Sequence, residues 1–330
     1  MLKPIYNIWP TQRKNLVFKR IMNNLRNKLT FSLFISLLVI GNTLTYAGES
    51  YSCFPSNELK DSEMKSIKST KGLYRTKSFT KQFPNPTSNI LPGLERAQLD
   101  DVIKRFENFW NPILLSRYQK TVSISNEWEE ERIDARATRD MDDNLIIMVH
   151  GALARHPEMN KNRMLLILCH ELGHYLGGAP KSFRGKSERR SWSSAEGQAD
   201  YFATTKCMPK MAMTDSLYNE RTTTYNGDRC KSEFCKRIVP MALGVSKVFS
   251  SLKGGGSEAS VVKKSNRIVR STNYRHPEPQ CRFDTFVAGS SCANDIDTDF
   301  DNMDYRIGSC LDDLQPEAAR PKCWFSPVKH

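Results

Sequence analysis

Residues 164–178 read MLLILCHELGHYLGG, and this stretch decides both the fold and the chemistry that we expect. His170 and His174 are four residues apart, which places them one turn apart on the same face of an α-helix. Two imidazoles in this arrangement can bind one zinc ion, and Glu171 lies beside them to accept a proton. Residues 164–169 are apolar throughout, so we expect a helix that is buried on all sides.

The pentapeptide His-Glu-x-x-His alone is only moderately specific, because two histidines can occur on one helix by chance. Gly177, Gly178 and Pro180 follow it, and they predict that the helix ends at a glycine cap before the proline. A catalytic zinc ion also needs a third protein ligand and an open position for water. A downstream residue therefore has to complete the ligand set.

Glu196 is the downstream candidate, 22 residues after His174, which leaves room for a loop and a return on a second helix. Ser193 or Ser194 is the expected N-cap of that helix. Glu196 and Asp200 are four residues apart and face the same way, so Glu196 can bind the metal while Asp200 accepts a hydrogen bond from a metal-binding histidine. The alternative is a solvated acidic helix face, which the apolar neighbours disfavour.

A third segment, His276-Pro277 followed by Arg282, extends the pattern. Together with His170-Glu171-x-x-His174 and Glu196-x-x-Ala199-Asp200 it resembles the glutamate-zincin peptidases. The chain is most similar to the prenyl-protein endopeptidase family and its relatives, the heat-shock membrane peptidases and periplasmic envelope peptidases. The motifs cover residues 160–284. The chain departs from the membrane members because no hydrophobic span follows residue 47, so the comparison is with soluble, exported relatives.

The resemblance implies a zinc-dependent endopeptidase. His170, His174 and Glu196 would bind one Zn²⁺ ion, and Glu171 would be the general base for a zinc-activated water that attacks the peptide bond. Two other functions stay open: a zinc-binding envelope assembly factor or chaperone with little proteolysis, and a zinc amidase that acts on cell-wall peptides.

The resemblance also implies the remaining site residues and the fold. His276 and Arg282 would line the active site and donate to the developing oxyanion, although a lone histidine such as His276 is as readily an ordinary surface residue. The expected fold class is α+β and zincin-like, with a small mixed sheet packed on the zinc-binding helix. From the residues themselves, namely the apolar run 240–252 and the downstream cysteines, we expect a helical part with a disulfide-rich C-terminal segment to follow.

The N-terminus predicts export. Residues 1–28 contain seven Lys and Arg and no acid, the uncharged apolar run 29–40 follows, and small residues surround Ala47. This is the pattern of a secretory signal peptide cleaved after Ala47, with an uncleaved anchor as the alternative and Met22 as a candidate start. We therefore expect a secreted or periplasmic protein with no integral membrane span after signal removal.

Charge predicts little about partners. The net charge of +13 includes the seven basic residues before Ala47, so the chain that remains after removal of residues 1–47 has a net charge of +6. That charge is compatible with association at an anionic envelope surface. The lysines are scattered and no aromatic residues interleave them, so we expect no nucleic-acid partner, and the expected partner is a protein or peptide substrate.

Nine cysteines agree with export. Cys169 lies in the apolar helix, where we expect it to be free and buried. The other eight predict up to four disulfides in an oxidising compartment. Their connectivity stays open, and the local spacings that favour short loops are Cys230/Cys235, Cys281/Cys292 and Cys310/Cys323.

Three regions follow from these patterns: the signal peptide at residues 1–47, an extended polar segment at 48–92 and the metallopeptidase domain at 93–330. Periodicity in the domain predicts a helix over residues 94–110 and an apolar helix over 240–252. We expect strands at 118–125, 131–138 and 145–149, and residues 145–151 are the expected edge that receives peptide substrate by strand addition. Residues 181–191 are expected to form a polar loop, either over the cleft or simply solvated.

Overall fold

The computed structural model describes residues 51–52, 93–183, 190–214, 216–218, 224–252, 258–292 and 295–327. All of them belong to one compact unit, Gly48–His330. The predicted signal peptide, most of the polar segment 48–92 and Cys53 lie outside the described residues. Within the described ranges, no helix has both the length and the apolar character needed to cross a bilayer.

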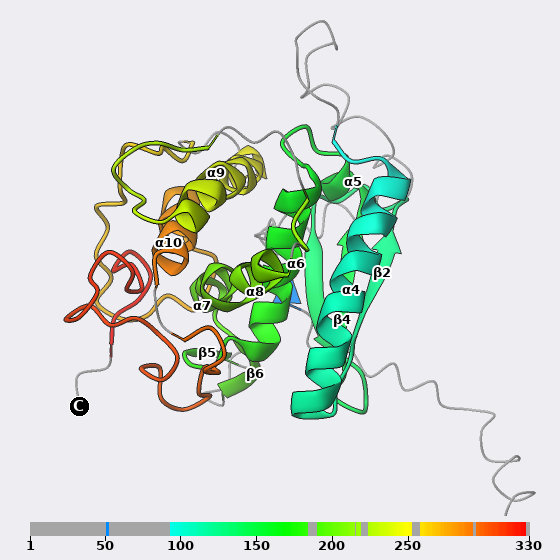
Figure 1. The fold of residues 1–330 in the computed structure, drawn as a ribbon, viewed down its shortest axis with the longest axis horizontal. Helices are drawn as coiled ribbons and strands as arrows, with labels where there is room; N and C mark the ends of the chain where they lie inside the picture. Colours follow the sequence, from blue (N-terminus) through cyan, green and yellow to red (C-terminus); the bar gives the residue numbers. More distant parts are fainter. Residues whose placement is uncertain are drawn as a thin grey trace, which may run out of the picture. The chain divides into compact units, whose positions relative to one another are not determined.

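A four-stranded mixed sheet forms one side of the domain, in the order β1-β3-β4-β2 (Figure 1). Strand β3 is antiparallel to both β1 and β4, whereas β2 runs parallel to β4. Alternate residues of β3 and β4 are fully buried, which directs one face of the sheet onto the helices. The bounds are Tyr51–Ser52 for β1, Val122–Glu127 for β2, Ala135–Arg139 for β3 and Leu145–His150 for β4.

The prediction that residues 145–151 form an edge strand is wrong. Strand β4 pairs with β3 on one side and with β2 on the other, and Gly151 already begins the short helix α5, Gly151–Ala154. The nearly continuous apolar run of β4 is typical of an interior strand with neighbours on both sides. The edges of the sheet are β1 and β2.

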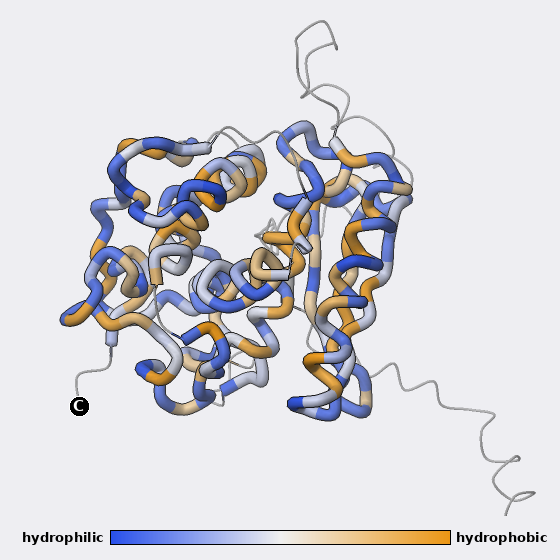
Figure 2. The backbone as a smooth tube through the Cα atoms, viewed as in Figure 1, coloured by the Kyte–Doolittle hydropathy of each residue, from blue (hydrophilic) through white to orange (hydrophobic). Residues whose placement is uncertain are grey.

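Helix α4, Arg96–Tyr118, packs on the sheet and begins at a capping box in which the Glu95 backbone N–H donates to Gln98 Oε1 at 3.0 Å. Its apolar residues recur along the helix as orange positions in Figure 2, and six of them are buried: Leu99, Val102, Ile103, Phe106, Trp110 and Leu114. The predicted helix is confirmed, and it continues through Pro112 to Tyr118. For that reason β2 begins at Val122, four residues later than the predicted strand.

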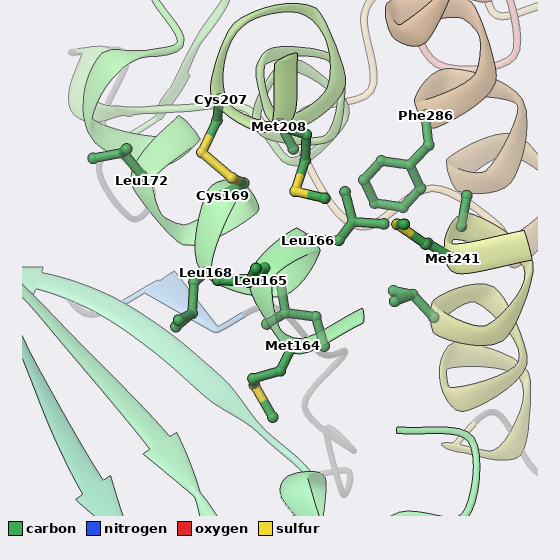
Figure 3. Close-up of a cluster of buried hydrophobic side chains, with 14 of the residues drawn as sticks. Met164, Leu165, Leu166, Leu168, Cys169, Leu172, Cys207, Met208, Met241 and Phe286 are labelled. Carbon is green, nitrogen blue, oxygen red and sulfur yellow. A yellow bond between two sulfur atoms is a disulfide. The ribbon is translucent and has the colours of Figure 1, made fainter. Parts of the chain in front are cut away.

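Helix α6, Lys161–Leu176, is the predicted central helix, and its residues 164–174 are all buried. The Asn160 side chain caps it by accepting from the Arg163 N–H at 2.9 Å. The helix ends at Gly177, and Gly178 follows in the left-handed region at φ +68°, where a Cβ would lie 2.5 Å from the Asp301 carbonyl oxygen. Figure 3 shows Leu166 of α6 pointing toward Met241 and Phe286.

The remaining helices lie on the other side of α6 from the sheet (Figure 1). They are α7 (Glu196–Phe202), the π-helical turn η1 (Ala203–Cys207), α8 (Met208–Met213), α9 (Glu233–Leu252) and α10 (Pro279–Ser290). The predicted apolar helix at 240–252 is confirmed as the C-terminal part of α9, in which Pro240 is an interior residue.

A second, two-stranded sheet joins α6 to α7. Strand β5, Lys181–Phe183, pairs antiparallel with β6, Arg190–Ser194. The ends of the expected polar loop therefore form a hairpin, and residues 184–189 lie outside the described residues. The predicted N-cap is also wrong: Ser193 and Ser194 belong to β6, and Ala195 is the N-cap of α7.

Four disulfides link the described cysteines, which suggests an oxidising compartment. Cys169 was expected to be free, but it pairs with Cys207 because α6 and η1 pack side by side, as Figure 3 shows. The spacing of Cys230 and Cys235 predicted a short loop, and these two are paired. The short loops favoured by the spacings Cys281/Cys292 and Cys310/Cys323 do not form, because the disulfides are Cys281–Cys323 and Cys292–Cys310, with sequence separations of 42 and 18 residues.

Candidate metal centre

Three side chains from two helices meet in the interior. His170 and His174 come from α6, and Glu196 is the first residue of α7. They are 1%, 0% and 5% exposed, and one ligand atom from each lies within 4.8 Å of the others. The Nε2 atoms of His170 and His174 lie 3.4 and 3.6 Å from Glu196 carboxylate oxygens. This buried His-His-Glu group could hold a metal ion.

The second ring nitrogens fix the orientation of both imidazoles. His170 Nδ1 lies 2.8 Å from Asp200 Oδ1, and His174 Nδ1 lies 3.0 Å from the Ser194 carbonyl oxygen. A proton on each Nδ1 satisfies these acceptors, so each Nε2 presents a lone pair toward Glu196. Burial lowers the pKa of His174 to about 4, which keeps that ring neutral, as a metal ligand must be.

Glu196 is ionised although it is buried. Burial alone would raise its pKa, but the nearby His276, His174 and His170 outweigh burial and hold the pKa well below its usual range. Among the described residues, its buried Oε2 has no hydrogen-bond partner. A buried carboxylate oxygen beside two imidazoles is a donor set that a divalent cation satisfies.

Glu171 lies beside the three candidate ligands and is fully buried. Neither of its carboxylate oxygens has a hydrogen-bond partner within the described part of the chain. Burial raises the pKa of Glu171 to about 8. An acid with this pKa and with both oxygens available can accept and return a proton near neutral pH.

Asp200 and Arg282 form a buried ion pair behind His170. Arg282 donates to Asp200 from Nε at 2.8 Å and from Nη2 at 2.7 Å, and both side chains are at most 1% exposed. The guanidinium also stacks on Phe249, 3.7 Å from the ring centroid. Burial would raise the pKa of Asp200, but Arg282 and His170 lower it overall, so Asp200 remains a carboxylate.

His276 is the most exposed member of the group. Its side chain is 21% exposed, and its Nε2 lies 3.4 Å from Glu196 Oε1. It stands shortly before α10, whose first turn carries Pro279. The structure thus brings His276 to the rim of the candidate centre, and it brings Arg282 to its interior.

The sequence indicated Ser193 and Ser194 only as helix caps, and their contacts with the centre were missed. Ser193 Oγ lies 3.0 Å from His174 Nδ1, and the Ser194 carbonyl faces the same nitrogen. Their position directly before Glu196 was the one available signal, because a strand that enters a ligand-bearing helix passes close to the ligands.

Comparison of the chain with protein-family models, with curated proteins and with solved structures finds no match. The interpretation of the site therefore depends on its own residues.

Proposed function

We propose that this chain is an exported zinc-dependent endopeptidase. The observation that carries the proposal is the buried His170-His174-Glu196 group with the Glu171 carboxylate beside it. Two histidines and a glutamate form the ligand set of many catalytic zinc sites, which keep one position open. Zinc bound there would supply a Lewis acid and lower the pKa of a water in the open position to about 7.

Glu171 supplies the proton transfer. Its carboxylate accepts the proton of the attacking water and delivers it to the leaving amine of the peptide bond. The pKa of about 8 describes the metal-free site, and a bound cation would favour the ionised carboxylate and lower that value.

Asp200 and Arg282 position the site and do not touch the reacting atoms. Asp200 holds His170 by its Nδ1, and Arg282 keeps Asp200 charged and fixed through two hydrogen bonds. Both contributions act on the geometry of the ligand, so their loss weakens metal binding before it affects chemistry.

His276 is the candidate for binding the oxyanion. Its position at the exposed rim allows a substrate carbonyl to approach the ring. Donation from this ring as negative charge develops would be worth about 2.7–4 kcal/mol if it resembles other single oxyanion donors. Arg282, which the sequence grouped with His276, is committed to Asp200 and takes a positioning role in this proposal.

Four disulfides support an exported protein, and the proposed signal peptide gives the route. Secretion and transfer to a periplasm would both fit. The proposed substrate is a protein or peptide.

A single substitution tests the proposal. Glu171→Gln removes the base but keeps the shape of the site, so zinc content stays normal while cleavage of a denatured casein substrate falls by about 10²–10⁴-fold. His174→Ala is the matched control, because it loses zinc as well as cleavage. Undiminished proteolysis by the Glu171→Gln protein at normal zinc content would reject the proposed role.

A further inference from the structure

A cavity of about 680 Å³ adjoins strands β5 and β6 and the C-terminal end of α6. This volume is typical of sites for small molecules and short oligomers, which span about 300–1,000 Å³. None of the described metal-centre residues His170, Glu171, His174 and Glu196 lines it. We call it the β6 cavity; its wall includes Lys181 of β5, and Arg190 and Trp192 of β6.

The wall of the β6 cavity is rich in aromatic rings. One stack places the Arg139 guanidinium 4.7 Å from the Trp192 ring centroid, with Tyr175 edge-on to that ring. A second places the Arg190 guanidinium 4.9 Å from the Tyr274 centroid. The lining rings are Tyr118, Tyr175, Trp192, Tyr274, Phe300, Tyr305 and Phe325. Because guanidinium groups already lie over the Trp192 and Tyr274 rings, a flat ligand with exposed C–H groups would pack on the ring surface that these arginines leave uncovered.

The charge of the wall favours an anion. Arg139, Lys181 and Arg190 line the cavity. Arg139 is paired with Asp143 at 2.8 Å, and the one acidic residue among the described lining residues, Asp299, accepts from Arg117 at 3.1 Å, so Lys181 and Arg190 supply the excess positive charge. Lys181 is only 9% exposed, so its charge acts where water screens it weakly. An anionic ligand would offset this excess of positive charge.

Two backbone carbonyl oxygens beside the cavity are already hydrogen-bonded. The Pro180 carbonyl accepts from Ala195 N–H at 2.9 Å, and the Trp192 carbonyl accepts from Lys181 Nζ at 2.9 Å. An extended peptide would need free backbone groups here to add as a strand. Hydroxyl and amide side chains also line the cavity, and these are Ser191, Thr272, Asn302 and Ser326. The Thr272 hydroxyl donates to the Ser326 carbonyl oxygen at 2.8 Å and the Ser326 hydroxyl donates to the Arg270 carbonyl oxygen at 3.3 Å, so these two hydroxyls would act toward a ligand as acceptors.

We propose that the β6 cavity binds an acidic oligosaccharide of the uronic-acid type. The sugar rings would pack on the aromatic faces, the carboxylates would pair with the basic side chains, and the hydroxyls would bond the polar lining residues. This binding site is separate from the metal centre, and the proposal does not depend on peptidase activity.

Titration calorimetry of the full chain with trigalacturonate, and with neutral maltotriose as the comparison, tests this proposal. Trigalacturonate should bind at least about tenfold more tightly than maltotriose, and added salt should weaken its binding. Arg190→Gln should lower trigalacturonate affinity about tenfold, the effect of losing one charge-assisted contact. The matched control is Arg96→Gln, another exposed arginine that does not line the cavity.

Tyr274→Ala provides an independent readout, because it should weaken both sugars while leaving the salt dependence of trigalacturonate binding intact. Adding a metal chelator should change none of these affinities. The proposal is overturned if trigalacturonate does not bind in the millimolar range, if maltotriose binds as well, or if Arg96→Gln and Arg190→Gln have equal effects. Tighter binding of a glutamate-rich peptide than of trigalacturonate would also overturn it.

Discussion

Strand β6 contributes to two regions that balance charge in opposite ways. At the metal centre the buried Arg282 is paired with Asp200, whereas the buried carboxylates Glu171 and Glu196 keep oxygens that have no hydrogen-bond partner among the described residues. In the β6 cavity, basic side chains exceed acidic ones and stack on aromatic rings. This difference is the basis for proposing a cation in the first region and an anion in the second.

The largest effect should come from breaking the buried ion pair. Arg282→Met leaves the Asp200 carboxylate buried without its cation, so we expect a loss of about 3–5 kcal/mol in the free energy of unfolding. Urea denaturation measures it. Adding Asp200→Asn to this variant should restore part of the loss, because the uncompensated charge is gone; a loss below about 1 kcal/mol in the single variant would reject this account.

The disulfides allow a matched comparison. Cys169–Cys207 closes a separation of 38 residues between the two ligand-bearing helical segments, whereas Cys230–Cys235 closes 5. Replacing both cysteines by serine should lower the free energy of unfolding by about 4 kcal/mol for Cys169–Cys207 and by about 2 kcal/mol for Cys230–Cys235. The difference arises because the longer loop gains more entropy in the unfolded chain when it is opened.

Only the Cys169–Cys207 variant should also bind zinc more weakly, because Cys169 precedes His170 directly. Denaturant unfolding and zinc titration of both variants provide the comparison. Equal zinc affinity in the two variants would show that this disulfide does not support the metal centre.

The two regions should titrate in different pH windows. Burial lowers the pKa of His174 to about 4 and that of Lys181 to about 8, from ordinary values of 6.5 and 10.5. In each window, 4 to 6.5 and 8 to 10.5, the unfolded chain binds more protons than the folded chain, so stability rises with pH. Across each window the free energy of unfolding rises by about 3 kcal/mol at most.

Unfolding of the metal-free protein across pH measures both rises. His174→Asn should flatten the acidic rise and leave the alkaline rise intact, whereas Lys181→Met should do the reverse. If either variant left its own window unchanged, the corresponding group would not be titrating as its burial implies.

The smallest expected effect is a loss of zinc affinity, and it comes from changing Asp200, the side chain that positions His170. In the double variant Arg282→Met with Asp200→Asn, where neither member of the ion pair is left as an uncompensated buried charge, the asparagine keeps the shape of the side chain but weakens its hold on the His170 Nδ1 proton, so zinc affinity should fall by about 10–100-fold. Competition with a chromophoric chelator measures the affinity. Trigalacturonate binding at the β6 cavity should stay unchanged in this variant, and an equal loss there would indicate general misfolding.

Much of the metal centre could be predicted from local spacing. His170 and His174 are one helical turn apart, as are Glu196 and Asp200, and α-helix geometry alone puts each pair on one face. The apolar residues 164–169 likewise predicted the buried helix α6, and the structure confirms that helix and its end at Gly177.

Features that depend on long-range packing could not be predicted. Cys169 and Cys207 meet only because η1 packs on α6, and nothing within the buried run distinguishes a bonded cysteine from a free one. The interior position of β4 depends on the parallel pairing with β2, which sequence order does not specify. The β6 cavity combines residues from 118 to 326, too widely separated for any periodicity to reveal.

The central claim is that the buried His170-His174-Glu196 group binds zinc, and metal analysis by native mass spectrometry tests it most directly. The purified chain should carry one zinc ion, which the Glu196→Ala variant and the double variant His170→Ala with His174→Ala should both lack while remaining folded. An unaltered zinc content in the double variant, or failure of the intact chain to bind supplied zinc, would contradict the account.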